Sequence, residues 1–214
     1  MCPHALIPFK PSSPKSRLSG MLSPEEREIF ARAMLNDVIA AVKDANCSPV
    51  IIATELYDSE DILVTIADND LSGSLNEVLS QAAGPVLILM ADLPLATGEA
   101  IRRLVNTKSD IAIVPGRGGG TNAIFVKEPT KFHVDYYGMS FSKHMQIVRE
   151  AGLTCEVVDS FLLHTDIDEE DDLVELLTHG TGKSRKCLED LGVTLSVAHG
   201  RVGVKRKDVY HQQS

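Results

Sequence analysis

The sequence predicts an α/β fold in which a mixed, mostly parallel central sheet lies between layers of helices. Short β-rich apolar runs alternate with segments of helical periodicity along the 214 residues. The run from Pro85 to Met90 is continuously apolar, which is typical of a central strand covered on both faces. Apolar residues make up 43% of the chain and charged residues 24%, enough for one well-buried core. Ligands of such sheets bind beyond the carboxyl ends of the strands, so function is sought in the loops that follow strands.

The first predicted strand is the apolar run from His4 to Phe9, and a loop follows it from Lys10 to about Leu22. Ser23-Pro24-Glu25-Glu26 then supplies an N-cap, a proline in the first helical position and a glutamate placed for a capping box. The helix is expected to reach about Ala45. Its expected apolar face consists of Ile29, Phe30, Ala33, Met34, Val38, Ala41 and Val42.

The later elements follow from the same periodicities. Strands are predicted at 50–54, 62–66, 85–90, 111–114, 123–126 and 156–158, and helices at 75–82, 98–106, 142–151 and 169–177. Residues 1–180 are expected to form one domain, and residues 181–214 an appendage that is rich in glycine and basic residues. We expect this appendage to serve as an oligomer contact, pairing two chains in a homodimer, and to fray from about Lys207 onward.

Charge and apolar patterning exclude several classes of partner. The net charge of −9 argues against a broad basic surface for nucleic acid. No apolar run approaches the ~20 residues needed to cross a bilayer, and the first ten residues lack the pattern of a signal segment. The four cysteines show no C-x-x-C spacing, which fits a reducing compartment. We therefore expect a cytoplasmic protein that binds neither nucleic acid nor membrane.

The loop after the first strand carries three cations within eight residues, namely Lys10, Lys15 and Arg17. Backbone N–H groups and hydroxyls such as that of Ser16 add hydrogen-bond donors, so the loop can surround a polyphosphate. The alternative is an ordinary solvated basic loop. The residues alone do not decide between the two.

Three aspartates are candidates for a metal site. Asp92 comes immediately after the buried strand, where hard cations bound to phosphates find a carboxylate, although it could instead cap the next turn. In Asp166-Ile167-Asp168 both carboxylates face one way on an extended segment while Ile167 enters the core. Two like charges held together favour a metal or a proton between them. Asp168 could also cap a helix that starts at Glu169, and both roles are compatible.

A glycine-rich turn joins two predicted strands at residues 115–122. Missing side chains let its backbone approach a ligand closely. Arg117 is placed to contact a phosphate or carboxylate, and Thr121 and Asn122 to orient substrate. The alternative is a merely tight hairpin.

Residues 137–142 precede a predicted helix that begins near Ser142, and the free N–H groups of a helix start form an anion site. Gly138, Ser140 and Phe141 lie in this stretch. His144 falls in the first turn of the helix, where it could assist the site or only pack.

Taken together, these segments resemble the 2-phospho-L-lactate guanylyltransferase family, which acts in the biosynthesis of the deazaflavin coenzyme F-420. The resemblance covers residues 4 to about 178. It rests on Pro-Phe-Lys and Lys-Ser-Arg-Leu within 8–18, Ser-Leu-Asn at 74–76, Ala-Asp-Leu-Pro at 91–94, Arg-Gly-Gly-Gly-Thr-Asn at 117–122, Tyr-Gly-Met-Ser-Phe at 137–141 and Asp-Ile-Asp at 166–168. The order and spacing of these pieces carry the resemblance.

The resemblance implies a Rossmann-like nucleotide-diphospho-sugar transferase (nucleotidyltransferase) fold that binds GTP and 2-phospho-L-lactate with Mg²⁺. The implied metal ligands are Asp92, Asp166 and Asp168, and the implied catalytic residues are Lys15, Arg17 and Asp92. The implied substrate-binding residues are Lys10, Arg117, Thr121, Asn122, Gly138, Ser140 and Phe141, and the nucleotide-binding residues are Ser16, Ser74 and Asn76. Two alternatives stay open: a nucleotidyltransferase acting on phosphoenolpyruvate or a sugar phosphate, and a non-catalytic nucleotide-binding regulatory module.

Overall fold

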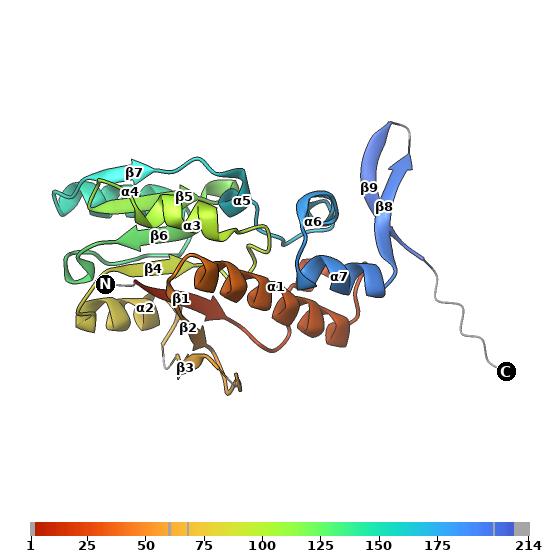
Figure 1. Ribbon diagram of the computed structural model, residues 1–214, viewed down its shortest axis with the longest axis horizontal. Helices are drawn as coiled ribbons and strands as arrows, with labels where there is room; N and C mark the ends of the chain where they lie inside the picture. The colour runs from red at the N-terminus through yellow and green to blue at the C-terminus, as the bar shows by residue number, and fades with distance from the viewer. Residues whose placement is uncertain (1–2, 60, 68, 199, 208–214) are drawn as a thin grey trace.

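Seven strands form one central sheet in the order β3-β2-β1-β4-β6-β5-β7 (Figure 1). The computed structural model describes residues 3–59, 61–67, 69–198 and 200–207. The strands are β1 (His4–Phe9), β2 (Ser48–Ala53), β3 (Leu63–Ile66), β4 (Val86–Leu89), β5 (Ile111–Pro115), β6 (Thr121–Val126) and β7 (Cys155–Val157). Each predicted strand is therefore present, with ends shifted by a few residues.

The sheet is mixed because β6 runs against its two neighbours, β4 and β5, whereas the other paired strands are parallel. The predicted mixed, mostly parallel sheet is confirmed. The reversal places the first residues of β6 beside the last residues of β4, since Ala123 pairs with Leu89. The start of β6 and the carboxyl end of β4 thus meet at one edge of the sheet.

Helices cover both faces of the sheet. The α-helices of the described residues are α1 (Pro24–Asp44), α2 (Leu71–Gln81), α3 (Gly98–Val105), α4 (Ser140–Glu150), α5 (Phe161–His164), α6 (Asp172–His179) and α7 (Lys183–Asp190). Successive strand residues point to opposite faces, so Ile7 joins a core with α1 and α3, while Leu6 joins a second core with α2 and α4. Among the described residues, no helix combines the length and the apolar character that a membrane crossing requires.

Helix α1 has the capping box that its first residues predict. The Ser23 hydroxyl accepts a hydrogen bond from the Glu26 N–H at 3.3 Å, and the Glu26 carboxylate accepts one from the Ser23 N–H at 2.8 Å. The predicted apolar face is wrong at Ile29, which is 57% exposed. Leu35 and Ile39 are buried instead, because the face that meets the sheet is turned toward them.

Two helices begin earlier than predicted. Helix α2 starts at Leu71 rather than 75, because the Asp70 side chain accepts a hydrogen bond from the Gly73 N–H at 2.7 Å and so caps the first turn. Helix α4 starts at Ser140 rather than Ser142. The polar and small residues at both starts hide the helical period.

Helix α6 begins later than predicted, at Asp172 rather than Glu169, so the expectation that Asp168 caps it is wrong. The Asp172 carboxylate instead accepts hydrogen bonds from the backbone N–H groups of Asp168 and Glu169, both at 2.8 Å. The side chain of Asp168 is thereby available for other contacts.

The chain after α6 forms α7 and a hairpin of β8 (Val193–Ala198) and β9 (Arg201–Arg206), which projects beyond the helices (Figure 1). These elements were not predicted. Helix α7 packs on α1, where the Asp37 carboxylate accepts hydrogen bonds from the Lys183 N–H, the Ser184 N–H and the Ser184 hydroxyl at 2.7, 2.9 and 2.5 Å. Leu188 is fully buried. The division of the chain at residue 180 stays a prediction.

The end of the hairpin is hydrogen-bonded to the start of α1 and the loop before it. The Arg206 guanidinium donates hydrogen bonds to the Glu26 carboxylate, at 2.5 and 2.8 Å, and to the Met21 carbonyl at 2.9 Å. The Lys207 N–H donates to the Gly192 carbonyl at 3.0 Å. The expected frayed end, residues 208–214, lies outside the described residues.

Candidate active site

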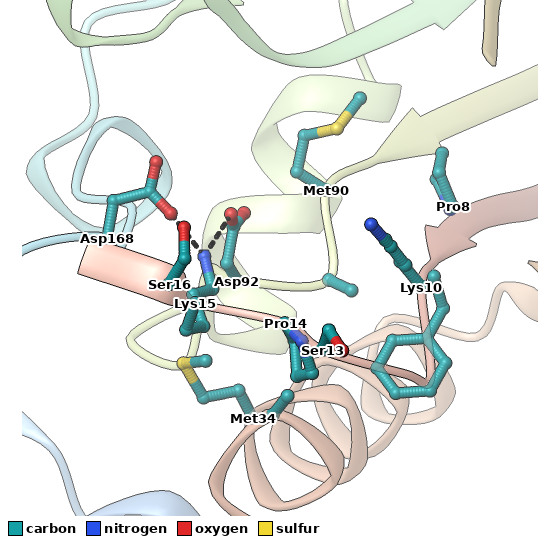
Figure 2. Close-up of a pocket in the computed structure, with 13 residues that line it drawn as sticks. Pro8, Lys10, Ser13, Pro14, Lys15, Ser16, Met34, Met90, Asp92 and Asp168 are labelled. Carbon is teal, nitrogen blue, oxygen red and sulfur yellow. Dashed lines mark hydrogen bonds and ion pairs between the residues drawn. The ribbon is translucent and has the colours of Figure 1, made fainter. Parts of the chain in front are cut away.

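A cleft of about 340 Å³ opens at the carboxyl ends of β1 and β4 (Figure 2). These two strands are parallel neighbours, so the loops that follow them leave the sheet side by side. The cleft is lined by Pro8, Phe9, Lys10, Ser13, Pro14, Lys15, Ser16, Ala31, Met34, Met90, Ala91, Asp92 and Asp168. The basic loop and two of the three candidate aspartates therefore face one cavity.

The ammonium group of Lys15 lies between two of the aspartates, as the dashed lines in Figure 2 show. Its Nζ is 2.7 Å from Asp92 Oδ2 and 2.5 Å from Asp168 Oδ1. Only 10% of the Lys15 side chain is exposed. Burial alone would lower the pKa of Lys15, but the two carboxylates outweigh it and hold that pKa above the usual 10.5. Lys15 therefore stays protonated and carries a positive charge in this cleft at neutral pH.

Residues 166–168 are held against Asp92 through the backbone. The Ile167 N–H donates to the Asp92 carbonyl at 3.0 Å, and the Ile167 side chain is fully buried, as the alternation of the segment predicts. The Asn122 side-chain amide donates to the carbonyl of His164 at 2.9 Å and lies 3.5 Å from Asp166 Oδ1. Burial, followed by the charge of Asp92, raises the pKa of Asp166.

A second cleft, of about 270 Å³, lies on the other side of Asp168. It is lined by Arg17, Arg117, Gly118, Asp166, Asp168, Glu169 and Asp172. Arg17 is 66% exposed, and its guanidinium is 3.5 Å from Asp168 Oδ2. The turn at Gly118 and Gly119 has φ values of +63° and +83°, a backbone conformation that glycine adopts without strain. Asp168 borders both clefts and connects the two groups of charged residues.

Arg117 is held by an ion pair with Asp172, which is 7% exposed. Sequence reasoning missed Asp172, whose carboxylate binds both Arg117 and the backbone after Asp168. An aspartate four residues beyond Asp168, in a run of acidic residues that precedes a helix, was the available signal. Asp172 thus links the glycine-rich turn to the aspartate loop.

Thr121, Ser140 and His144 form a separate buried group beneath the start of α4. The Ser140 hydroxyl donates to Thr121 Oγ1 at 3.1 Å, and His144 Nδ1 is 3.0 Å from the same oxygen. His144 Nε2 accepts a hydrogen bond from the Asp135 N–H at 3.0 Å, so the proton of the neutral ring is on Nδ1. Burial lowers the pKa of His144 to about 4. His144 is therefore a neutral, packed residue at neutral pH.

The other predicted contact residues do not line either cleft, although Asn122 lies next to Asp166. Within the described ranges, the linings of both clefts omit Ser74, Asn76, Thr121, Asn122, Gly138, Ser140 and Phe141. The Asn76 side chain pairs with both backbone groups of Val134, at 2.7 and 3.0 Å, and the Ser74 hydroxyl donates to the Asn69 carbonyl at 3.2 Å. Their contacts with substrate stay predictions.

The three aspartates supply the oxygen donors that a hard divalent cation prefers. Lys15 shows directly that a positive charge is stabilised between Asp92 and Asp168. Among the residues that the structure describes, no three Asp, Glu, His or Cys side chains are grouped closely enough to hold a metal as they stand. The chemistry of these residues fits a metal, and binding one would require their side chains to rearrange.

Comparison with solved structures confirms the predicted fold. A protein of Desulfovibrio desulfuricans G20, assigned provisionally as a nucleotide-diphospho-sugar transferase, matches with a TM-score of 0.73 and 16% identity over 89% of this chain and 95% of that one. A Mycobacterium tuberculosis H37Rv protein solved in complex with manganese matches with a TM-score of 0.52 and 15% identity, over 83% of this chain and 98% of that one. At these identities the matches show the shared fold.

The sequence comparisons go further. A protein of Methanoregula boonei named 2-phospho-L-lactate guanylyltransferase is 82% identical over 206 residues, which is 96% of each chain. Residues 3–210 match the family described as guanylyl transferase CofC like. This chain therefore belongs to the CofC-like guanylyl transferase family.

Proposed function

We propose that the cleft around Lys15 joins GTP and 2-phospho-L-lactate to give lactyl-2-diphospho-5'-guanosine and pyrophosphate, a step in coenzyme F-420 biosynthesis. The family and the 82% identical relative confirm the predicted class, a nucleotidyltransferase, and its guanylyl-transfer function. The single observation that carries the assignment to this cleft is the buried ammonium of Lys15 between Asp92 and Asp168. An ammonium group held between two carboxylates suits a site that binds phosphates.

The reaction needs no nucleophile from the protein. A phosphate oxygen of 2-phospho-L-lactate attacks the α-phosphorus of GTP, a new P–O bond forms, and the bond to the leaving pyrophosphate breaks in line. This oxygen is already ionised at neutral pH, so no general base is required. The protein contributes positioning and charge neutralisation.

Cations of the basic loop are placed for that task. Lys15 and Lys10 line the cleft, and Arg17 lies across Asp168 from them. In the proposal, Lys15 and Arg17 face the triphosphate and Lys10 binds the acceptor. Ammonium and guanidinium groups form strong charge-assisted hydrogen bonds with phosphate oxygens.

We propose Mg²⁺ as the cofactor, held by Asp92, Asp166 and Asp168. The fold relative solved with manganese supports a divalent ion in this fold. Bound there, the ion would offset the negative charge of the phosphates. The chain's own part is to hold three carboxylates within reach, through the hydrogen bond from the Ile167 N–H to the Asp92 carbonyl.

The remaining assignments belong to the same proposal. Residues proposed to bind the acceptor are Lys10, Arg117, Thr121, Asn122, Gly138, Ser140 and Phe141, and residues proposed to bind the nucleotide are Ser16, Ser74 and Asn76. For Thr121 and Asn122 the support is their position at the start of β6, at the same edge of the sheet as the end of β4. A homodimer and a cytoplasmic location also stay proposals.

Pyrophosphate release tests the proposed function. The purified chain is given each of four nucleoside triphosphates with 2-phospho-L-lactate, phosphoenolpyruvate or mannose 1-phosphate, and with no acceptor as the control. We expect release that requires both GTP and phospholactate. Release that depends equally on another acceptor, or GTP binding without any acceptor-dependent release, would overturn the assignment.

A matched control variant tests whether the cleft is the site. Lys186→Met removes one positive charge from the surface of α7, where the side chain is 75% exposed. It should keep the wild-type rate, whereas Lys15→Met should lose it. Equal rates in the two variants would show that the reaction does not take place in the cleft around Lys15.

A further inference from the structure

The position of the Lys15 ammonium has a consequence for metal binding that rests on the proposed function. We propose that Lys15 is an internal counter-ion of the metal site, which must leave Asp92 and Asp168 before a divalent cation can bind both carboxylates. Metal binding is then weak in the protein without nucleotide and becomes tight when the phosphates of GTP draw Lys15 away.

The first support is geometric. One nitrogen, Lys15 Nζ, is within hydrogen-bonding distance of Asp92 Oδ2 at 2.7 Å and of Asp168 Oδ1 at 2.5 Å (Figure 2). A divalent cation bound to the same two oxygens would lie beside the ammonium. Two positive charges a few ångströms apart repel each other, and the Lys15 side chain is only 10% exposed, beside carboxylate side chains that are 28% and 39% exposed. The two cations therefore exclude one another.

The second support is the grouping of the carboxylates. Lys15 contacts Asp92 and Asp168, whereas the Asp166 side chain lies 3.5 Å from the Asn122 amide. Among the described residues, three acidic groups are not gathered around one point. The ammonium group of Lys15 binds two of the three carboxylates, which accounts for Asp166 lying apart from them. A metal bound by all three aspartates would have to draw the Asp166 carboxylate toward the other two.

The third support is the loop that presents the lysine. Ser13 and Lys15 have φ values of +50° and +53°, a left-handed conformation that side chains other than glycine rarely adopt. Such conformations persist where the surroundings hold them. The loop is anchored at Pro14, whose carbonyl accepts a hydrogen bond from Arg27 at 3.2 Å. The flexible four-carbon stem of Lys15 can therefore redirect the ammonium while the loop stays in place.

The triphosphate supplies the alternative partner. Phosphate oxygens accept strong charge-assisted hydrogen bonds from an ammonium group. When Lys15 turns to them, Asp92 and Asp168 are left to the metal. Because coupling between two ligands is reciprocal, metal and nucleotide must each raise the affinity for the other.

Manganese binding to the nucleotide-free protein tests this without any turnover. Free Mn²⁺ is measured by electron paramagnetic resonance during titration of the wild-type chain and of Lys15→Met. We expect Lys15→Met to bind Mn²⁺ about tenfold more tightly, which corresponds to about 1.4 kcal/mol. The assay contains no GTP or acceptor, so its outcome is independent of the test of the proposed function.

Two variants that also lose one positive charge distinguish two effects on Mn²⁺ affinity: the ammonium group occupying the metal site, and the overall loss of positive charge. Arg17→Met removes a charge 3.5 Å from Asp168 without vacating the position between the carboxylates, and Lys186→Met removes a distant one. Each should change Mn²⁺ affinity by about twofold or less, as exposed charges do. An affinity of Lys15→Met no higher than that of Arg17→Met would overturn the proposal.

A measurement on the wild-type chain covers the case in which Lys15→Met does not fold. The lysine ammonium groups are followed by nitrogen-15 NMR as Mg²⁺ is added without nucleotide. We expect the hydrogen-bonded Lys15 signal to disappear in step with metal binding. A Lys15 signal that survives at saturating Mg²⁺ would contradict the exclusion of one cation by the other.

Discussion

Acidification should destabilise this protein through His144, which is fully buried. Burial lowers its pKa in the folded chain to about 4, from an ordinary value of 6.5, although the nearby Asp135 carboxylate acts in the opposite direction. Between these two pH values the unfolded chain binds a proton that the folded chain does not. The free energy of unfolding must therefore fall as the pH drops, with the contribution of His144 complete above about 6.5 and lost by about pH 4.

The size of the effect follows from the same two pKa values. At about 1.4 kcal/mol for each pKa unit, the full loss is about 3 kcal/mol. Between pH 7 and pH 5 the expected loss is about 2 kcal/mol. Urea unfolding at these two pH values measures it for the wild-type chain and for His144→Gln, in which the neutral side chain cannot titrate.

The comparison between variants isolates His144 from other groups that titrate in this range. His144→Gln should lose about 2 kcal/mol less than wild type on the change from pH 7 to pH 5. His179→Gln, at a side chain that is 48% exposed on α6, is the control for replacing an imidazole at the surface. Equal losses in wild type and His144→Gln would refute the reasoning.

Four further substitutions have defined outcomes. Asp92→Asn and Asp168→Asn should each abolish guanylyl transfer while leaving the far-ultraviolet circular dichroism unchanged, and near-normal turnover in either variant would contradict their assigned role. Asp37→Ala should lower the free energy of unfolding by about 2 kcal/mol, because three hydrogen bonds at the start of α7 lose their acceptor; urea unfolding checks this, and an unchanged midpoint would show that α7 is held otherwise. Ser23→Ala should lower it by about 1 kcal/mol through loss of the capping box, whereas Ser80→Ala on α2, away from that helix end, should lower it less in the same assay.

The sheet could be predicted from the sequence because its signals are local. Val86–Leu89 is apolar throughout and fully buried, and the capping box of α1 is complete within four residues. Helix α7 could not be predicted in this way. The residue at its N-cap is Gly182, which has no side chain to accept a hydrogen bond. The free N–H groups of the first turn instead donate to Asp37, which is more than a hundred residues away in the chain. A contact between residues so far apart in the chain produces no periodic pattern in the sequence.

Part of the candidate site could be predicted from the sequence, but the contacts between its residues could not. Lys15, Asp92 and Asp168 do meet at the edge of the sheet, since two parallel strands end there. The direct contact of Lys15 with both carboxylates depends on a left-handed backbone at Lys15, which residue type does not indicate. Asn122 was expected to orient substrate, and it binds backbone carbonyls about forty residues further along.

The reversed direction of β6 has a consequence for how this scaffold tolerates change. Val126, at its end, pairs with the first residues of β4 and β5, so the connection at Lys127 and Glu128 lies at the opposite rim from Asp92. Extra residues inserted after the exposed Glu128 should leave catalysis nearly intact, whereas the same insertion after Gly118 would disturb the second cleft of the candidate active site. Tags or fluorescent labels for following this enzyme are therefore best attached at that distant rim.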